Sequence, residues 1–470
     1  MLDIVNSIGG ILWGYVLIAV LILTGVYFTI RLGFIQFRHF GHTFSVLKNS
    51  RKEDSSGISS FQALATSLAA RVGVGNMGGV AVAIYLGGAG AVFWMWLIAL
   101  IGMATSFAES SLAQLYKVKD DDGNYRGGPA YYMEKGLGQR WMGVLFSIFL
   151  IIAFGLVFNA VQAGAITDSM YAAFGTPKLL VGLVLVCISA AIIFGGIRTI
   201  AKFAELVVPA MALVYLAIAA YVVIINISQV PAMFELIFKS AFGLQEAGAG
   251  AIGAAIMNGV KRGMFSNEAG MGSAPNAAAS ASPYPPHPAS QGYVQMLGVF
   301  IDTIVICTAT AAIILLSGQL EPGSGVSNIE LTQLALTSQV GEWGGIFIAI
   351  AIFFFAFTSI VANYSYAETN LIFLEHNHKV GINIFRCFVL IMVMFGALAE
   401  SPLVWAMADV SMGLMALINL IAMLLLSNVV VKLAKDYNAQ RAANKLPTFD
   451  AAQYPELEKN IEPGIWNANK

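Results

Sequence analysis

The chain has 470 residues, of which 58% are hydrophobic and only 11% charged, and its net charge is −1. A soluble domain carries roughly a quarter charged residues, so this composition excludes a soluble globule and indicates a protein solvated by lipid. The weak net charge also excludes the basic surface of a nucleic-acid-binding protein.

Eleven apolar stretches follow one another along the chain, and each can supply the roughly 20 residues that a membrane-spanning helix needs, although the seventh is overlong. The charged stretches RKEDSSG (51–57) and KDDDGNYRGG (119–128), and the proline-rich SPYPPHP (282–288), are typical of loops. The start, MLDIVNSIGG, lacks the positive charge of a signal peptide, so we expect the first apolar stretch to remain as a span. The predicted spans are 11–31, 61–85, 89–113, 141–166, 179–196, 203–226, 246–282, 291–316, 343–367, 380–397 and 402–431.

The basic residues are distributed very unevenly over the predicted loops. Of the 25 lysines and arginines, 20 fall on one side of the membrane, and only Lys178 and Lys239 fall on the other. Because cytoplasmic loops carry an excess of lysine and arginine, we expect the N-terminus outside and the C-terminus in the cytoplasm of a bacterial inner-membrane protein. The tail from Lys432 onward is polar, and we expect it to be partly disordered.

Two of the predicted spans do not read as continuous helices. The second contains RVGVGNMGG (71–79), whose four glycines each cost roughly 1 kcal/mol relative to alanine within a helix. The seventh contains RGMFSNEAGMGSAP (262–275), which combines glycine, proline and charge. Small residues also serve close helix packing, but ionisable groups in the same segments favour unwound backbone facing a cavity or a partner. In the seventh span the break is predicted at Asn258–Gly259 or at Phe265–Gly270.

The second and seventh spans would cross the membrane in opposite directions. Broken helices in corresponding places of two inverted halves are typical of secondary transporters with a binding site between the halves. No clear residue-level similarity joins the halves, so this prediction depends on the topology and the breaks. We expect an N-terminal peripheral span and loop (1–60), a first five-helix repeat (61–226), a second repeat (227–431) and a cytoplasmic tail (432–470).

A broken helix offers free N–H groups to a carboxylate and free carbonyl groups to a cation. Gly73 and Gly75 allow the backbone to approach a ligand closely, and Asn76 offers an amide. In the seventh span the polar groups lie between Ser266 and Gly270. The residues predicted to bind substrate are Gly73, Gly75, Asn76, Gln162, Ser266, Asn267, Glu268 and Gly270.

Further polar groups lie deep in other spans. Asp302 is predicted to bind a cation, with a buried arginine as the alternative partner. Thr358 and Ser359 are candidates for a second cation, although such hydroxyls often bond to their own helix, and Gln162 is nearly as well suited to bond two helices together. Arg71 and Arg262 are expected to pair with carboxylates such as Glu268. Nearer the span ends, Glu109 and Asp409 are interpreted as structural or vestibular, and Cys187, Cys307 and Cys387 as small packed hydrophobes.

Several long motifs resemble the bacterial and archaeal alanine or glycine:cation symporters, over nearly the whole chain. They are GVGN (73–76), GGAGAVFWMWLIALIG (87–102), RGMFSNEAGMGSAP (262–275) and GVFIDTIVICTATA (298–311). The resemblance implies an all-α LeuT-like fold of two inverted five-helix repeats plus one extra N-terminal helix, and symport of alanine or glycine with Na⁺ or, in some members, H⁺.

The resemblance also implies roles for individual residues. Gly73, Gly75 and Asn76 would meet the substrate carboxylate and a cation, and Asn76 with Asp302 would form one Na⁺ site. Thr358 and Ser359, with backbone carbonyls near Val72 and Gly75, would form the other site. The segment FAFTSIVANYSYAE (355–368) matches the family only loosely, which makes the Thr358 and Ser359 assignment the weakest.

Two other classes of membrane protein compete with this interpretation. A channel needs continuous pore-lining polarity, whereas the polar residues here gather at one depth of a few spans. An enzyme needs a nucleophile or a metal set, and none stands out in the sequence. We therefore predict a transporter whose partners are a small amino acid and membrane lipid, with Na⁺ as the coupling ion and H⁺ as the alternative.

Overall fold

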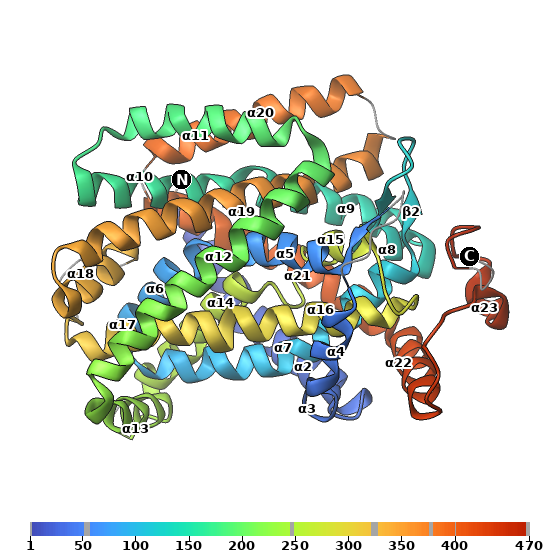
Figure 1. Ribbon diagram of the computed structural model, residues 1–470, viewed down its shortest axis with the longest axis horizontal. Coiled ribbons are helices and arrows are strands. Elements are labelled where there is room, and N and C mark those ends of the chain that lie inside the picture. The colour runs from blue at the N-terminus through green and yellow to red at the C-terminus, as the bar shows by residue number, and fades with distance from the viewer. Residues whose placement is uncertain are drawn as a thin grey trace.

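The computed structural model describes residues 2–50, 57–244, 249–320, 328–375, 379–399 and 401–466. Most of its helices run along the longest axis of a single bundle (Figure 1). The charged connector predicted at 51–57 lies, apart from Gly57, outside the described residues. The end of the bundle that carries the C-terminus is called the tail end here, and the other end the opposite end.

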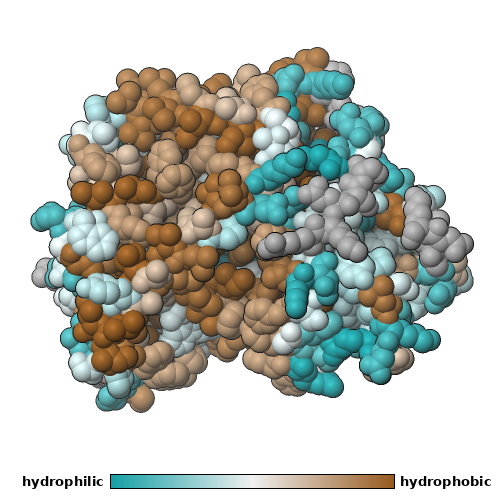
Figure 2. All heavy atoms as spheres, in the orientation of Figure 1, coloured by the Kyte–Doolittle hydropathy of each residue, from teal (hydrophilic) through white to brown (hydrophobic). Residues whose placement is uncertain are grey.

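The surface of the bundle matches a protein that crosses a membrane. Figure 2 shows hydrophobic residues over most of the visible face and hydrophilic residues gathered at the tail end. Large apolar side chains point outward from long helices; for example, Leu206, Leu213 and Ile391 are 75%, 68% and 60% exposed. Lipid solvates such side chains, so their exposure marks the belt that lies in the membrane.

The first part of the chain forms fifteen consecutive helical segments. Among them α11 packs beside the later helix α20 at one edge of the bundle (Figure 1). The segments are α1 (Leu2–Ile11), η1 (Leu12–Leu17), α2 (Ile18–Arg31), α3 (Ile35–Arg38), α4 (Phe40–Lys48), α5 (Ser60–Arg71), η2 (Gly75–Gly79), α6 (Val80–Gly87), α7 (Gly90–Leu115), α8 (Pro129–Leu137), α9 (Arg140–Leu150), η3 (Ile151–Val157), α10 (Phe158–Phe174), α11 (Lys178–Ile193) and α12 (Gly196–Ile225).

The second part packs its helices against the first. Helix α7 contacts α14 and α16, and α10 contacts α19 and α20. The segments are η4 (Ile227–Gln229), α13 (Val230–Ala241), α14 (Ala249–Asn267), α15 (Pro275–Ala279), α16 (Pro288–Val299), η5 (Phe300–Cys307), α17 (Thr308–Ser317), α18 (Ile329–Val340), α19 (Trp343–Glu375), α20 (Lys379–Leu398), α21 (Ser401–Leu425), α22 (Ser427–Ala442), η6 (Ala451–Gln453) and α23 (Pro455–Glu458).

Within the described residues, eight helices are long and apolar enough to cross a membrane, or nine if the bent pair α5–α6 counts as one span. They correspond to nine of the eleven predicted spans. The other two predicted spans are represented by α11, which is apolar but only 16 residues long, and by α14, which has 19 residues. The count of eleven stays a prediction.

The predicted break in the second span is confirmed. Helix α5 starts with a capping box, in which the Ser59 hydroxyl and the Gln62 side chain each bind the other's backbone N–H. It ends at Arg71, and the chain resumes as the π-helical turn η2 and helix α6 with a bend of 52°. Glycine enrichment in η2 agrees with the low helix propensity that predicted the break.

The break in the seventh span lies at 268–274, because α14 continues to Asn267 and α15 begins at Pro275. The prediction of a break near Phe265–Gly270 is therefore correct, and the alternative at Asn258–Gly259 is wrong. Glu268, Gly270 and Gly272 all have positive φ angles, of 59°, 82° and 87°. Glycine adopts this region without strain, which explains two of the glycines of the motif.

Two short strand pairs lie at the tail end. Strand β1 (Ile58–Ser59) pairs in parallel with β4 (Ala281–Ser282), so the segment leading into α5 is bonded to the segment that follows α15. Strands β2 (Val118–Lys119) and β3 (Tyr125–Arg126) form an antiparallel hairpin between α7 and α8. The β1–β4 pair thus links the two broken spans.

The prediction that the C-terminal tail is partly disordered is wrong for its described part. Helix α22 begins at Ser427, and residues 443–466 fold back onto the tail end. Phe449, Leu457, Ile461 and Trp466 are 3%, 7%, 6% and 5% exposed. These widely spaced apolar anchors bury enough surface to order a segment whose overall composition is polar.

We expect Gly272→Ala to destabilise the protein more than Gly138→Ala. Both glycines have positive φ, but a Cβ on Gly272 would lie 2.9 Å from Phe146 and Asn419, whereas a Cβ on Gly138 would meet nothing within 4 Å. Crowding should add about 1–3 kcal/mol to the backbone strain that both variants share. Thermal unfolding of the detergent-solubilised variants measures this difference, and equal melting temperatures would contradict the packing described for the break.

Candidate functional site

The two breaks meet in the middle of the bundle. A Cβ on Gly75 would lie 3.1 Å from the ring of Phe265 and 3.2 Å from Cα of Ser266. The turn η2 also contacts α14 and η5. The structure therefore brings Gly75 and Asn76 of the second span next to Ser266 of the seventh, and all three residues are buried.

The backbone groups freed by the first break are taken up by side chains. In a continuous helix the N–H of Gly73 would bond to the carbonyl of Ala69. Instead, Gly73 N–H donates to Asn76 Oδ1 at 2.9 Å, and the Ala69 carbonyl accepts from the Ser359 hydroxyl at 2.8 Å. Likewise, Val74 N–H donates to Gln162 Oε1 at 3.0 Å. The break thus presents N–H groups and a carbonyl to polar side chains, two of which come from other helices.

A second cluster surrounds the carboxylate of Asp302. Its oxygens accept hydrogen bonds from Asn76 Nδ2 at 2.7 Å, from Ser266 Oγ at 2.8 Å and from Thr303 Oγ1 at 2.7 Å. All four side chains are fully buried. Among the described residues no lysine or arginine lies within 4 Å of Asp302, although Arg71 interacts with it electrostatically at longer range. The surroundings of this carboxylate are neutral hard-oxygen and amide groups.

Cys307 also belongs to this cluster. From the sequence it is interpreted only as a small packed hydrophobe. Its Sγ lies 3.1 Å from Ser266 Oγ and accepts from Asn76 Nδ2 at 3.4 Å. Because η5 is a π-helical turn, in which residues five apart come to one face, Cys307 shares a face with Asp302. In an α-helix Asp302 and Cys307, five residues apart, would lie on different faces. The π-helical turn therefore accounts for their being in the same cluster.

Thr358 and Ser359, the two residues predicted to bind a second cation, make different contacts. The Ser359 hydroxyl reaches the break, as described above, and also bonds to Phe355 O at 3.0 Å. The Thr358 hydroxyl donates to Phe355 O of its own helix at 2.9 Å. Thr358 therefore follows the alternative in which a hydroxyl bonds back to the preceding turn, and only Ser359 contacts the break.

Three of the predicted substrate residues lie in or next to the loop of the second break, on its tail-end side. Asn267 Oδ1 accepts from Ala269 N–H at 3.0 Å, and Glu268 accepts from the Ser273 hydroxyl at 2.6 Å. Gly270 N–H donates to Glu109 Oε1 at 3.2 Å. These groups brace the loop itself and do not contact the Asp302 cluster through hydrogen bonds. Arg71 and Glu268 interact electrostatically, but they form no ion pair within 4 Å.

Arg262 pairs with Asp409 and not with Glu268. Its Nη2 lies 2.7 Å from both carboxylate oxygens of Asp409, and Lys261 Nζ lies 2.5 Å from Oδ2. The expected pairing of Arg262 with a carboxylate is confirmed, but the partner is Asp409 and not the suggested Glu268, because α14 stays helical to Asn267 and carries Arg262 away from the break. These three residues line a cavity of about 650 Å³ that also contains Asp168 and Lys178. The cavity is called the vestibule here.

Aromatic rings connect the lining of the vestibule, through Trp405, to Phe265 next to Ser266. The ring of Phe265 lies 4.7 Å from that of Phe158 and 4.9 Å from that of Trp405. The guanidinium of Arg262 lies 4.7 Å from the centre of the Trp405 ring, which is cation–π distance.

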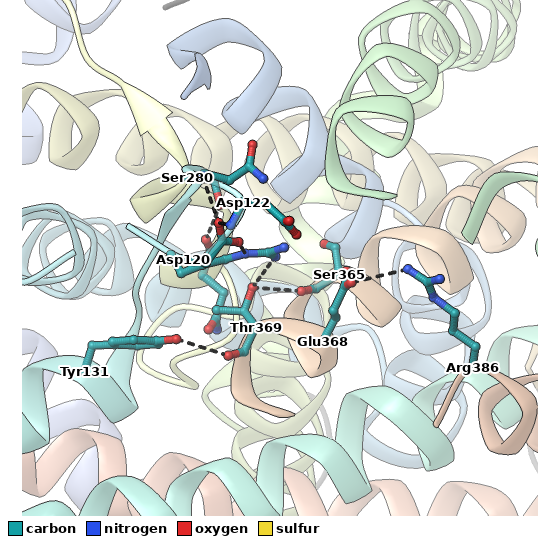
Figure 3. Close-up of polar contacts among 11 residues, drawn as sticks. Asp120, Asp122, Tyr131, Ser280, Ser365, Glu368, Thr369 and Arg386 are labelled. Atoms are coloured by element: carbon teal, nitrogen blue, oxygen red, sulfur yellow. Dashed lines mark hydrogen bonds and ion pairs between the residues drawn. The ribbon is translucent and has the colours of Figure 1, made fainter. Parts of the chain in front are cut away.

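At the tail end, a polar network closes the bundle (Figure 3). Arg126 pairs with Asp120 at 2.9 Å and donates to the Thr369 hydroxyl at 3.3 Å. Tyr131 donates to the carbonyl of Thr369 at 3.4 Å, and Arg386 lies 3.5 Å from Glu368. The network ties the β2–β3 hairpin and α8 to α19 and α20. This network borders a cavity of about 420 Å³ lined by Asp120, Arg126 and Tyr131, and the vestibule lies toward the opposite end of the bundle.

Comparison with known proteins gives concordant results. Residues 1–451 match the sequence profile of the "Sodium:alanine symporter family". The probable sodium/glutamine symporter GlnT of Bacillus subtilis is 50% identical, over 97% of this chain and 94% of its own length. The sodium/alanine symporter AgcS of Methanococcus maripaludis is 40% identical, over 93% of this chain and 98% of its own.

Solved structures share the architecture at much lower identity. A crystal structure of a point mutant of the Eremococcus coleocola manganese transporter superposes with a TM-score of 0.54 at 14% identity. The match covers 79% of this chain and 81% of that one. At this identity the match establishes the fold, an all-helical LeuT-like transporter fold, and nothing about the ligand.

If Cys307 belongs to the binding site, ligands should protect it from a small methanethiosulfonate reagent. Cys187 and Cys387, which are exposed on the bundle surface, serve as internal controls in the same sample. We expect Na⁺ together with alanine to slow labelling of Cys307 at least several-fold and to leave Cys187 and Cys387 unchanged. Labelling rates come from peptide mass spectrometry, and equal rates with and without ligand would remove Cys307 from the site.

Proposed function

Since the chain belongs to the sodium:alanine symporter family and is a Na⁺-coupled amino-acid symporter of LeuT-like fold, we propose that it imports alanine or glycine, bound between its two broken helices. The observation that carries this proposal is the pairing at the first break. Freed N–H groups of Gly73 and Val74 face Asn76 and Gln162 beside the second break. A carboxylate placed there would replace the two side-chain acceptors.

The proposed substrate is small because the space between the breaks is narrow. A Cβ on Gly73 would lie 2.7 Å from Gln162 Oε1, and Phe265 stands over Gly75. The rings of Phe158, Phe265 and Trp405 close the side toward the vestibule. A branched apolar side chain placed between the breaks would have to displace these rings.

For Na⁺, the second transported species, we propose Asp302 as the charged ligand. Alkali cations take hard oxygen donors, and Ser266 Oγ and Thr303 Oγ1 already lie within 2.8 Å of this carboxylate. The side-chain oxygen of Asn76 accepts from the N–H of Gly73 at the break, and its side-chain nitrogen donates to Asp302. A cation at Asp302 therefore competes with the Asn76 amide, which would couple Na⁺ binding to the geometry of the substrate site.

A second cation would use the Ser359 hydroxyl and the freed carbonyl of Ala69, which already bond to each other at 2.8 Å. Thr358 would join them only after leaving its bond to Phe355 O. The number of cations moved per cycle follows from whether this second site fills. The Hill coefficient of uptake against Na⁺ concentration distinguishes one site from two, because a value above 1 requires more than one Na⁺ per cycle.

We propose that the tail end faces the cytoplasm and the vestibule faces the outside of a bacterial inner membrane. The predicted cytoplasmic basic residues meet at the tail end, in agreement with the contacts of Arg31 with Asn428 and of Arg441 with His39. Lys178, predicted to be external, lines the vestibule. With this orientation the membrane potential contributes about 2.3 kcal/mol per 100 mV for each Na⁺ that enters.

Glutamine is the second candidate substrate, because GlnT, which is named a probable sodium/glutamine symporter, is 50% identical to this chain. The polar amide of glutamine would have to displace Phe265 or Trp405 from the ring stack to fit. H⁺ remains the alternative coupling ion. Competition between amino acids distinguishes the substrates, and replacement of Na⁺ by a proton gradient distinguishes the coupling ions.

Uptake of radiolabelled alanine into proteoliposomes tests the proposal. We expect accumulation that depends on an inward Na⁺ gradient, saturates, and is reduced by excess glycine but not by excess leucine. Strong inhibition by glutamine would make the larger substrate the principal one. Accumulation driven equally by a proton gradient without Na⁺ would contradict Na⁺ coupling.

Asp302→Asn should weaken Na⁺ binding about 10–100-fold, because the loss of a charged ligand costs about 1.5–3 kcal/mol. Alanine uptake at saturating Na⁺ should survive better than uptake at low Na⁺. Glu235→Gln, which removes an exposed carboxylate on α13, is the matched control and should leave the Na⁺ dependence unchanged. A half-saturating Na⁺ concentration in Asp302→Asn equal to that of the parent protein would exclude Asp302 as a ligand.

A further inference from the structure

Residues 443–466 cross the tail end of the bundle and are called the strap here. The strap contains η6 and α23, and its backbone closes on itself where Ala451 N–H donates to Trp466 O at 3.0 Å. Four of its apolar side chains are buried, as described above. The strap is therefore a folded segment with specific contacts to the rest of the bundle.

One end of the strap is anchored at the end of α7. The indole N–H of Trp466 donates to Gln114 O at 3.2 Å, and Lys117 Nζ lies 5.0 Å from the Trp466 ring. The same two residues hold strand β4, because Gln114 Nε2 and Lys117 Nζ donate to Ala281 O at 3.0 and 2.7 Å. Trp466 therefore sits on the residues that hold the segment following the second break.

The other contact region lies on the loop between β4 and α16. Phe449 N–H donates to Pro286 O at 3.0 Å, and the Phe449 ring packs edge-on against His287 at 5.5 Å. His287 Nδ1 accepts from Ala289 N–H, so the proton of the neutral ring is on Nε2, which donates to Asp436 on α22 at 3.1 Å. Burial lowers the pKa of His287, which favours this neutral form.

Ion pairs add further attachment points. Lys135 on α8 lies 2.9 Å from Glu462, and Lys432 on α22 pairs with Glu456. The strap thus bridges α7, α8, α22 and the loop before α16. Of these elements, α7 bonds to β4 through Gln114 and Lys117, and β4 pairs with β1 at the start of α5.

We propose that the strap is a latch that holds the tail end closed, and that its release is required for the substrate site to open to the cytoplasm. This inference rests on the proposed function, because opening at the tail end is a step of alternating access. For that step the two broken spans must separate there. The strap fixes α7, β4 and the β4–α16 loop to one another on the surface, where it can be released without disturbing the buried clusters.

The latch can be tested without transport, by the labelling rate of a cysteine next to strand β4, which Gln114 and Lys117 hold. Ser280→Cys introduces a thiol at a position that is 3% exposed, next to β4. A membrane-impermeant methanethiosulfonate is added to the full-length protein in detergent, and labelling of that peptide is followed by mass spectrometry. We expect Trp466→Ala to raise the rate about fivefold or more, and Lys459→Ala, on the exposed face of the strap, to leave it unchanged.

A charge swap guards against unfolding of the Trp466 variant. Lys135→Glu should raise the labelling rate, and the double variant Lys135→Glu with Glu462→Lys should restore the parent rate, which a general loss of folding would not do. Equal labelling rates in Trp466→Ala, Lys135→Glu and the parent would overturn the latch. Because labelling needs no substrate, an absence of alanine uptake by the parent protein would refute the proposed function without affecting this result.

Discussion

The central constraint on this structure is that a helix broken at membrane depth must find partners for its freed backbone groups. Water cannot supply them there. Beyond Arg71 the chain uses Asn76 and Gln162 to accept from Gly73 and Val74, and Ser359 to donate to Ala69. Since Gln162 and Ser359 belong to α10 and α19, these hydrogen bonds also determine where those helices stand. The same groups that keep the break stable are the ones that a substrate carboxylate and a cation would take over.

The carboxylates of Asp302 and Asp409 have different partners. Asp302 in the centre is surrounded by neutral donors and has no ion-pair partner within 4 Å among the described residues. Asp409, beside the vestibule, is paired with both Lys261 and Arg262. A carboxylate already paired with two cations has little affinity left for Na⁺, whereas one surrounded by neutral hydroxyl and amide groups has no competing cation within 4 Å in the described part of the chain. This contrast supports Asp302 as the cation ligand and Asp409 as part of the access route.

The sequence was sufficient to predict the helical membrane fold, the two breaks and the meeting of Asn76 with Asp302 and Ser266. The helical fold and the breaks followed from local signals, namely glycine clusters in apolar helices and ionisable groups at membrane depth, whereas the pairing of Asn76 with Asp302 followed from the resemblance to the symporter family. The misses share a physical origin in geometry that sequence spacing does not encode. Cys307 joins Asp302 only through a π-helical turn, and Arg262 meets Asp409 only because α14 stays helical to Asn267. The tail was misjudged because its mean polarity hid a few anchors such as Trp466.

The two ends of the binding site are closed by different kinds of interaction. Toward the vestibule the barrier consists of side chains, the rings of Phe265 and Trp405 and the ion pairs of Asp409, and side-chain rotation can open it. At the tail end the barrier consists of backbone pairing between β1 and β4, the Arg126 network and the strap. Opening there requires whole segments to move, which takes place on a slower timescale than rotamer changes. If transport proceeds by the proposed alternating access, this asymmetry makes opening at the tail end the slower of the two steps.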